Sequence, residues 1–223
     1  AKMNAFTVAM LAQLAAHLDV IERDRSVAAV MLTATGDRAF CTGADITAWG
    51  GLTPAEFARH WVRDGHRIFD RLARLCKPTI AVLNGPAFGG GLELAAACDL
   101  RVMATGASLA LPEAGVGIVP GWSGTQRLLR LMPEPMVKEM ALFGHRIKAD
   151  RELACGFVAA VGDDPRALAM GLIDRASQLS PRAVEISKAM IHAAQNEDRA
   201  AMVEALGSAA IAATEDRSEG VAA

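Results

Sequence analysis

Two glutamates occupy positions where a carboxylate could do acid–base chemistry. Glu93 follows three consecutive glycines, Gly89 to Gly91, and opens an Ala/Leu-rich run that predicts a helix. Glu113 follows Pro112 at the end of a short apolar run and precedes a second glycine-rich stretch, a context that suits a solvated surface charge poorly. Two carboxylates that face one water can exchange protons with a substrate, because repulsion and desolvation raise the pKa of one of them toward neutrality.

The glycine triplet has three possible interpretations. A phosphate-binding P-loop needs a Lys-Ser/Thr pair after its last glycine, but Leu92 and Glu93 stand there, and a carboxylate would repel a triphosphate. A dinucleotide fingerprint needs the spacing G-x-G-x-x-G, which residues 89–91 do not have. The third interpretation is an oxyanion hole, in which backbone N–H groups at a helix start hold an oxygen that carries negative charge.

The role of Glu93 depends on its pairing with Glu113. An acidic residue in a first helical turn commonly complements the helix dipole, and the local sequence alone favours that structural role for Glu93. The second carboxylate changes the interpretation to acid–base catalysis. No Ser-His-Asp arrangement or nucleophile elbow competes with this pair, and no metal site is predicted because the five histidines are scattered without ligand spacing.

The elements that must position these residues alternate between helix and strand through about residue 111. Residues 7–23 predict a helix with Thr7 as its N-cap, and residues 53–56 have the form of a capping box before a long helix. Short apolar runs predict strands at residues 27–33, 79–83, 100–104 and 108–111, the first two buried on both faces. The alternation indicates an α/β core whose strand-to-helix turns carry the chemistry.

From Thr125 onward the pattern predicts an all-helical appendage. The expected helices are residues 126–132, 136–143, 150–155, 165–179, 181–196 and 198–214. Their Ala, Met and Ile faces are more apolar than a solvated helix needs. Two interpretations remain open: these faces pack on the core, or they form contacts between subunits.

The composition limits the class of protein. With 223 residues, of which 52% are hydrophobic, the chain suits one large domain or a core with a smaller appendage. A net charge of −2 and only 4% aromatic residues give no reason to expect nucleic acid as a partner. The four cysteines form no CxxC pair and are expected to be buried free thiols. The absence of a membrane-spanning run or a signal peptide predicts a cytoplasmic protein without a membrane partner.

At the glycine triplet and the two glutamates, the chain resembles the enoyl-CoA hydratase/isomerase family, also called the crotonase family. The matching stretches are residues 38–46, 77–81, 84–99, 111–128, 144–147 and 154–158. Because they follow one another in order over nearly the whole chain, the resemblance does not rest on a single motif.

The resemblance implies an α/β fold with a spiral core of ββα units and a helical C-terminal region that makes trimers, usually paired into hexamers. It places the core and the helices that follow it in residues 1–164, and the oligomerisation region in residues 165–223. The first hairpin strands of the family and its last segment have no counterpart here, so the resemblance also implies a piece of a longer chain.

The resemblance further implies an acyl-CoA thioester as substrate, with no cofactor beyond the coenzyme A that the substrate carries. The N–H groups of Ala44 and Gly90 would hold the thioester oxygen as an enolate develops. Glu93 and Glu113 would hold one water, with Glu113 as the proton shuttle and Glu93 positioning or activating the water. Further substrate contacts are implied at Ala39, Cys41, Gly43, Asp45, Ile46, Gly89, Gly121 and Trp122. Core packing is an equal alternative for Trp122.

The presence of Glu93 selects among the activities of the family. Isomerases of the family commonly keep only the glutamate at the position of Glu113, so the resemblance favours a hydratase of fatty acid metabolism that adds water to a trans-2-enoyl-CoA. The alternatives are a Δ3-Δ2 enoyl-CoA isomerase or a specialised acyl-CoA dehydratase. A non-catalytic relative that binds nucleic acid is a rival from another class, against which both intact glutamates argue.

Overall fold

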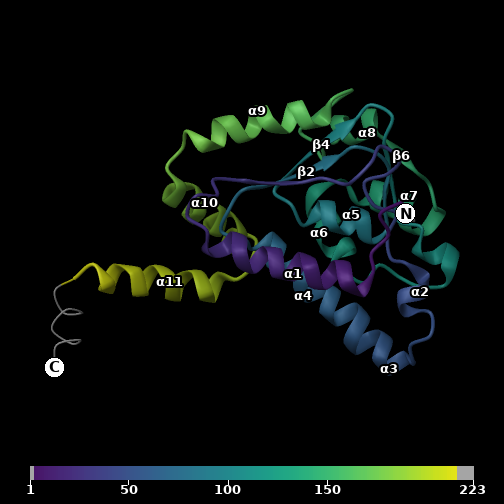
Figure 1. The fold of residues 1–223 in the computed structure, drawn as a ribbon, viewed down its shortest axis with the longest axis horizontal. Coiled ribbons are helices and arrows are strands. Elements are labelled where there is room, and N and C mark those ends of the chain that lie inside the picture. The colour runs from purple at the N-terminus through teal and green to yellow at the C-terminus, as the bar shows by residue number, and fades with distance from the viewer. Residues whose placement is uncertain (1–2, 215–223) are drawn as a thin grey trace. The chain divides into compact units, whose positions relative to one another are not determined.

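The computed structural model describes residues 3–214, and its main sheet is parallel (Figure 1). Four strands lie in the order β1 (Val30–Leu32), β2 (Thr79–Leu83), β4 (Leu100–Ala104) and β7 (Ala160–Gly162). Their registers pair Val30 with Thr79, Ile80 with Leu100, and Val102 with Ala160. The prediction of a strand at residues 79–83 is confirmed to the residue, and β2 is buried along its whole length.

A second sheet lies beside the glycine triplet. Strand β3 (Ala87–Phe88) pairs in parallel with β5 (Ser108–Ala110), which pairs in the antiparallel sense with β6 (Ile147–Lys148). Because β3 runs into the triplet and β5 runs toward Glu113, this sheet brings the two predicted carboxylates to one end of its strands.

The helices before the triplet begin at the predicted caps. Helix α1 (Val8–Arg23) begins after Thr7, whose side chain accepts a hydrogen bond from the N–H of Met10. The capping box at Thr53 and Glu56 opens α3 (Pro54–Glu56), which continues as a π-helix (Phe57–Val62) and then as α4 (Arg63–Ala73). The predicted single long helix is therefore interrupted by a π-helical turn, and α4 packs against α1.

The helices after the triplet surround the site or follow it in the chain. Helix α5 (Gly90–Ala96) is buried at every residue and packs against α6 (Gly124–Leu131). Helices α7 (Glu134–Phe143) and α8 (Ala149–Ala154) complete this group, whereas the short α2 (Ile46–Trp49) lies before the triplet in the chain. Within residues 3–214, no helix is long and apolar enough to cross a membrane.

One strand prediction and the prediction of an all-helical region are wrong in part. Strand β1 spans only Val30 to Leu32 and is half-buried, whereas residues 27–33 were expected to form a strand buried on both faces. The region after Thr125 is not all helical, because β6 and β7 lie within it and β7 pairs with β4. These strands have only two and three residues, too few to carry a sequence period.

The chain separates into two compact units, residues 1–178 and 179–223. This division falls later than residue 164, because α9 (Pro165–Ser177) packs on β2, β4 and β7 (Figure 1). Ala169 of α9 lies fully buried in an apolar cluster with Ile80, Val82 and Val102 of the sheet.

The second unit contains α10 (Pro181–Ala194) and α11 (Arg199–Ala212), which contact each other. Ser180 caps α10 as its side chain accepts a hydrogen bond from the N–H of Ala183. The role of these helices in oligomerisation stays a prediction. The family segments expected before and after this sequence border residues 1–2 and 215–223, which lie outside the described residues.

Candidate active site

The glycine triplet forms a turn that only glycine suits at its first position. Gly89 has φ 50° and ψ −124°, and its N–H donates to the carbonyl of Ala110 on β5 at 2.9 Å. A Cβ atom at Gly89 would lie 2.7 Å from Oε1 of Glu113. The turn is therefore packed directly against the second carboxylate, and a side chain at this position would displace it.

Glu93 is held by two backbone donors from the loop that precedes α6. Its side chain is 2% exposed, and Oε1 accepts hydrogen bonds from the N–H groups of Trp122 and Gly124, each at 2.8 Å. Burial raises the pKa of Glu93, and these two hydrogen bonds act in the opposite direction because they favour the ionised form. The arrangement fixes one oxygen and the orientation of the carboxylate.

Glu113 is buried as well but is far less hydrogen-bonded. It begins a 3-10 helix (Glu113–Val116) directly after β5 and Pro112, and it is 7% exposed. Its Oε2 atom is buried without a hydrogen-bond partner among the described residues. Burial raises the pKa of Glu113 to about 7, and the negative charge of Glu93 adds to the increase. A buried oxygen without a partner suits a group that receives a water or a substrate atom.

The loop that carries Gly43 and Ala44 lies against the glycine triplet. The parallel bridge between Phe6 and Ala44 holds it, as Phe6 N–H donates to the Gly43 carbonyl at 2.7 Å and Asp45 N–H donates to the Phe6 carbonyl at 2.8 Å. A Cβ atom at Gly43, where φ is 96°, would lie 3.6 Å from the nitrogen of Gly90. The loop that carries Ala44 therefore lies beside the start of α5.

The two candidate oxyanion donors, the N–H groups of Ala44 and Gly90, are available to a ligand. Ala44 and Gly90 both line the pocket, and within residues 3–214 the structure records no acceptor for either N–H. Buried or half-buried N–H groups are nearly always paired, so two neighbouring unpaired ones indicate a place for an oxygen of a ligand.

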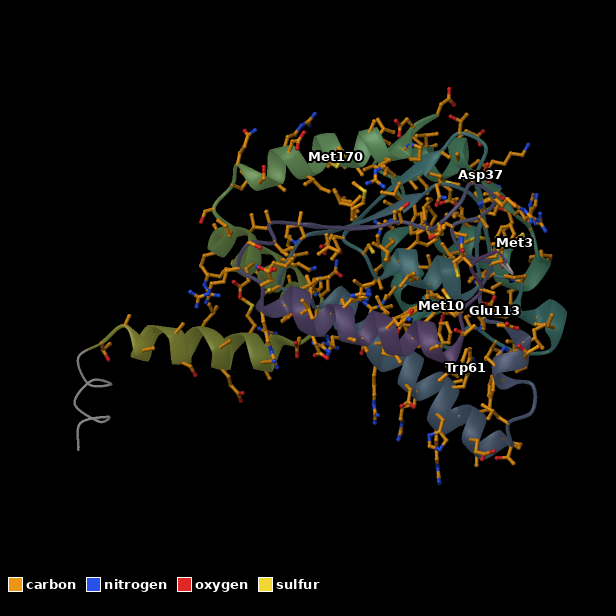
Figure 2. All side chains as sticks on the ribbon, viewed as in Figure 1. Met3, Met10, Asp37, Trp61, Glu113 and Met170 are labelled. Atoms are coloured by element: carbon orange, nitrogen blue, oxygen red, sulfur yellow. The ribbon has the colours of Figure 1, made fainter. Side chains whose placement is uncertain are left out.

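Both glutamates and both residues that carry the candidate donors line one pocket of about 170 Å³. Most of the remaining lining is apolar, and Glu113 and Trp61, two of its residues, are labelled in Figure 2. The π-helix contributes Phe57, Trp61 and Val62 to the wall. An acyl chain and a reacting water fit such a lining, because apolar walls exclude bulk solvent while a few polar groups fix orientation.

Trp122 fills both of the roles that the sequence left open. Its ring lies in the core against Phe6, Phe69 and Trp61, with centroids 5.1 to 5.6 Å apart, and its Nε1–H donates to the carbonyl of Trp61 at 3.2 Å. The same residue lines the pocket, and its backbone N–H holds Glu93. Gly65 leaves room for the ring, since a Cβ atom there would lie 2.2 Å from Nε1 of Trp122.

The pocket collects most of the residues singled out in the sequence. Those on its lining are Gly43, Ala44, Ile46, Gly89, Gly90, Glu93, Glu113, Gly121 and Trp122. Ala39, Cys41 and Asp45 lie outside the lining. The first two are buried, and Asp45 caps α2 by accepting a hydrogen bond from the N–H of Thr47. A substrate contact at these three residues stays a prediction.

Sequence reasoning missed several wall residues. They are Thr42, Val62, Pro112, Val116, Ile118 and Val119. The resemblance to the family implies that residues 49–61 shape the acyl pocket, and Trp49, Phe57 and Trp61 from this range line the pocket. Within the described part of the chain, no group of three or more His, Cys, Asp or Glu residues could hold a metal ion.

An α/β core that places two carboxylates and two unpaired N–H groups on one apolar pocket defines a class of enzyme that acts on an activated carbonyl compound. The sequence profile of the enoyl-CoA hydratase/isomerase family matches residues 1–223. The chain belongs to this family, and it has the crotonase fold.

Individual relatives support the same assignment. The short-chain-enoyl-CoA hydratase of Clostridium acetobutylicum is 36% identical over 85% of this chain and 73% of that protein. The crotonyl-CoA hydratase of Syntrophomonas wolfei is 35% identical over 99% of this chain and 86% of that protein. Among solved structures, an enoyl-CoA hydratase from Bacillus anthracis superposes with a TM-score of 0.83 at 33% identity, covering 99% of this chain and 86% of that one.

Proposed function

We propose that this protein is an enoyl-CoA hydratase, a hydro-lyase that adds water reversibly across the 2,3 double bond of a trans-2-enoyl-CoA. The observation that carries the proposal is the contrast between the two buried carboxylates of one pocket. Glu93 has one oxygen fixed by two N–H donors, while Glu113 has an oxygen without a partner and a pKa of about 7. Burial raises the pKa of both carboxylates, but only Glu93 has backbone donors that favour its ionised form, so the hydrogen bonds assign the base to Glu93 and the acid to Glu113.

The hydration step follows from this assignment. The thioester oxygen accepts hydrogen bonds from the N–H groups of Ala44 and Gly90, which polarises the conjugated double bond. Ionised Glu93 takes a proton from the water as its oxygen bonds to the β-carbon, and the electron pair of the double bond moves toward the thioester oxygen to give an enolate. Protonated Glu113 then gives its proton to the α-carbon. A proton transfer from Glu93 to Glu113 restores the starting state.

The two N–H donors supply the electrostatic part of this mechanism. Loss of one oxyanion-hole donor commonly costs about 3–4 kcal/mol of transition-state stabilisation. The apolar wall from the π-helix strengthens the effect, because a water-poor surrounding weakens the screening of the developing negative charge. The chain's own residues provide every acid, base and donor that the step needs, and we propose that it needs no cofactor.

The direct test is hydration of crotonyl-CoA, followed by the loss of absorbance of its conjugated thioester. Wild type is expected to be active, and Glu93→Gln and Glu113→Gln are each expected to lower kcat by about 100- to 10,000-fold. Glu152→Gln is the matched control, because Glu152 is a fully buried glutamate that does not line the pocket. Full activity in both of the first two variants would contradict the two-glutamate mechanism.

The same assay separates the other candidates. An isomerase would leave crotonyl-CoA unchanged and convert a 3-enoyl-CoA to the 2-enoyl isomer, a reaction for which Glu113 alone would suffice. A dehydratase of a specialised acyl group would act on neither substrate. A salt-sensitive shift of RNA without thioester activity would support a binding protein.

We also propose that the protein forms trimers, or hexamers made of two trimers, and acts in fatty acid metabolism in the cytoplasm. Support for assembly comes from large apolar side chains exposed on the second unit, which are Leu179, Met190, Ile191, Val203 and Leu206. Light scattering after size exclusion tests the assembly, and a monomer at micromolar concentration would contradict it.

A further inference from the structure

Ser123 stands between the two N–H donors that hold Glu93, and its backbone is in the left-handed region. Its φ is 74° and its ψ is 13°, a backbone conformation that a residue with a Cβ atom rarely adopts. Trp122 on one side and Gly124 on the other both donate to the same oxygen of Glu93. The left-handed residue is therefore the bend that makes two N–H groups two residues apart converge on one atom.

Gly124 shows how little freedom this contact has. A Cβ atom at Gly124 would lie 2.6 Å from Cγ and 2.7 Å from Oε1 of Glu93. The loop backbone thus lies in direct contact with the carboxylate. A small rotation of the backbone at Ser123 would move both donors relative to Glu93.

The side chain of Ser123 is tied to α4. Its hydroxyl lies 3.0 Å from Nδ1 and 3.3 Å from Nε2 of His66, within hydrogen-bond distance of both ring nitrogens. Asp70, one turn further along α4, lies 3.6 Å from Nε2 of His66 and forms an ion pair with Arg127 of α6. The N–H of Arg127 donates to the carbonyl of Ser123 at 3.0 Å. Helix α4 therefore holds the loop at Ser123 and the helix that follows it.

These three residue types do not form a nucleophilic triad. Ser123 is 6% exposed and is absent from the pocket lining, so its hydroxyl does not face a substrate. Asp70 is shared with Arg127 and with Arg74, which lies 3.6 Å from its Oδ2 atom. The cluster holds the backbone and presents no nucleophile to the pocket.

We propose that the hydrogen bond between His66 and Ser123 positions Glu93, by holding Ser123 in the left-handed conformation that directs the N–H groups of Trp122 and Gly124 at Oε1. His66 and Ser123 are positioning residues and touch no substrate. The kinetic consequence of the proposal rests on the hydratase function proposed above, whereas the backbone geometry does not.

The energetic argument is that the left-handed conformation needs compensation. For a residue other than glycine it is less stable than the right-handed one, and a side-chain hydrogen bond to another element offsets the difference. Without that bond the loop gains freedom, and the two donors spend less time on Glu93. A carboxylate held less firmly is a poorer base toward the bound water, while the apolar wall that binds the acyl group is unchanged. The effect is therefore expected in kcat and not in KM.

The test uses His66→Ala and Ser123→Ala, with His66→Gln as the conservative variant and Arg67→Ala as the control. Arg67 lies next to His66 on α4, its side chain is 69% exposed, and it forms an ion pair with Asp64 of the same helix, so its loss leaves the loop in place. Both alanine variants are expected to lower kcat for crotonyl-CoA about tenfold at unchanged KM, which is the scale of one hydrogen bond. His66→Gln, whose amide can still bond the hydroxyl, is expected to recover most of kcat.

Two further measurements make the outcome decisive. The double variant His66→Ala/Ser123→Ala should be no slower than either single variant, since both remove the same bond. Amide exchange followed by NMR in the unliganded protein should be faster at Trp122 and Gly124 in both alanine variants than in wild type and Arg67→Ala. Unchanged exchange at these two amides, or additive losses of kcat, would overturn the proposal. If wild type fails to hydrate crotonyl-CoA, the hydratase function fails, and amide exchange alone still decides whether His66 positions the loop.

Discussion

Replacing Glu113 with glutamine should make the protein more stable while it removes the activity. In the folded chain Glu113 holds its proton up to about pH 7, whereas an unfolded chain loses it near the usual value of 4.5. Between these values the unfolded state binds fewer protons, so the stability of wild type falls as pH rises through this window and stays low above it. A shift of this size corresponds to about 3 kcal/mol at alkaline pH. Glutamine has nearly the same shape and carries no charge to bury.

The assay is denaturant unfolding of wild type and Glu113→Gln at pH 5 and pH 8. The stability difference in favour of the variant is expected to grow by about 2 kcal/mol between these two pH values, because wild type alone must bury an ionised carboxylate at pH 8. Glu134→Gln is the control, since Glu134 is an exposed residue paired with Lys138, and the hydrogen bond from Lys138 lowers its pKa. A stability difference that is independent of pH, or that grows toward pH 5, would refute the reasoning.

Three further substitutions test the packing of the site and the other buried acid. Gly89→Ala should lower kcat for crotonyl-CoA hydration by about 100-fold, because the new Cβ atom would lie 2.7 Å from Oε1 of Glu113 and displace it. Gly124→Ala should lower kcat on the same scale through its contact with Glu93, and wild-type rates in either variant would show that the carboxylate tolerates movement. Burial also raises the pKa of Glu152 to about 7. In denaturant unfolding, the stability of Glu152→Gln relative to wild type should therefore increase from pH 5 to pH 8, and its kcat should equal that of wild type. A loss of kcat in that variant would link Glu152 to the site.

The sequence predicted those features that depend on local chemistry. The caps at Thr7 and Thr53 are confirmed because a hydroxyl that bonds an N–H three residues ahead needs no tertiary partner. Strand β2 is confirmed because a short β-branched run between a proline and a glycine turn is specified by its own residues. The sequence also predicted that Glu93 and Glu113 lie close together, because each stands beside a glycine-rich turn at the end of a strand or the start of a helix, and both line one pocket.

The remaining features depend on partners that are distant in the chain. No periodicity marks Ala160 to Gly162 as a strand, since three residues become one only by pairing with β4. The left-handed backbone of Ser123 has no signal in a serine, which seldom adopts it, and its partner His66 lies on another helix. The sequence could not predict that the N–H groups of Trp122 and Gly124 hold Glu93, because nearly every residue has the same backbone N–H group.

The position of β7 sets an order for folding during synthesis. Glu93, Glu113 and the loop through Gly124 leave the ribosome before β7, yet β4 pairs with β7 along the edge opposite β2. Until Ala160 to Gly162 are made, β4 presents an unpaired edge next to a buried apolar strand, the kind of edge on which chains aggregate. The main sheet therefore lacks its last strand until after the residues of the site have been synthesised, and a chain that stalls before β7 would present the free edge of β4 to other chains.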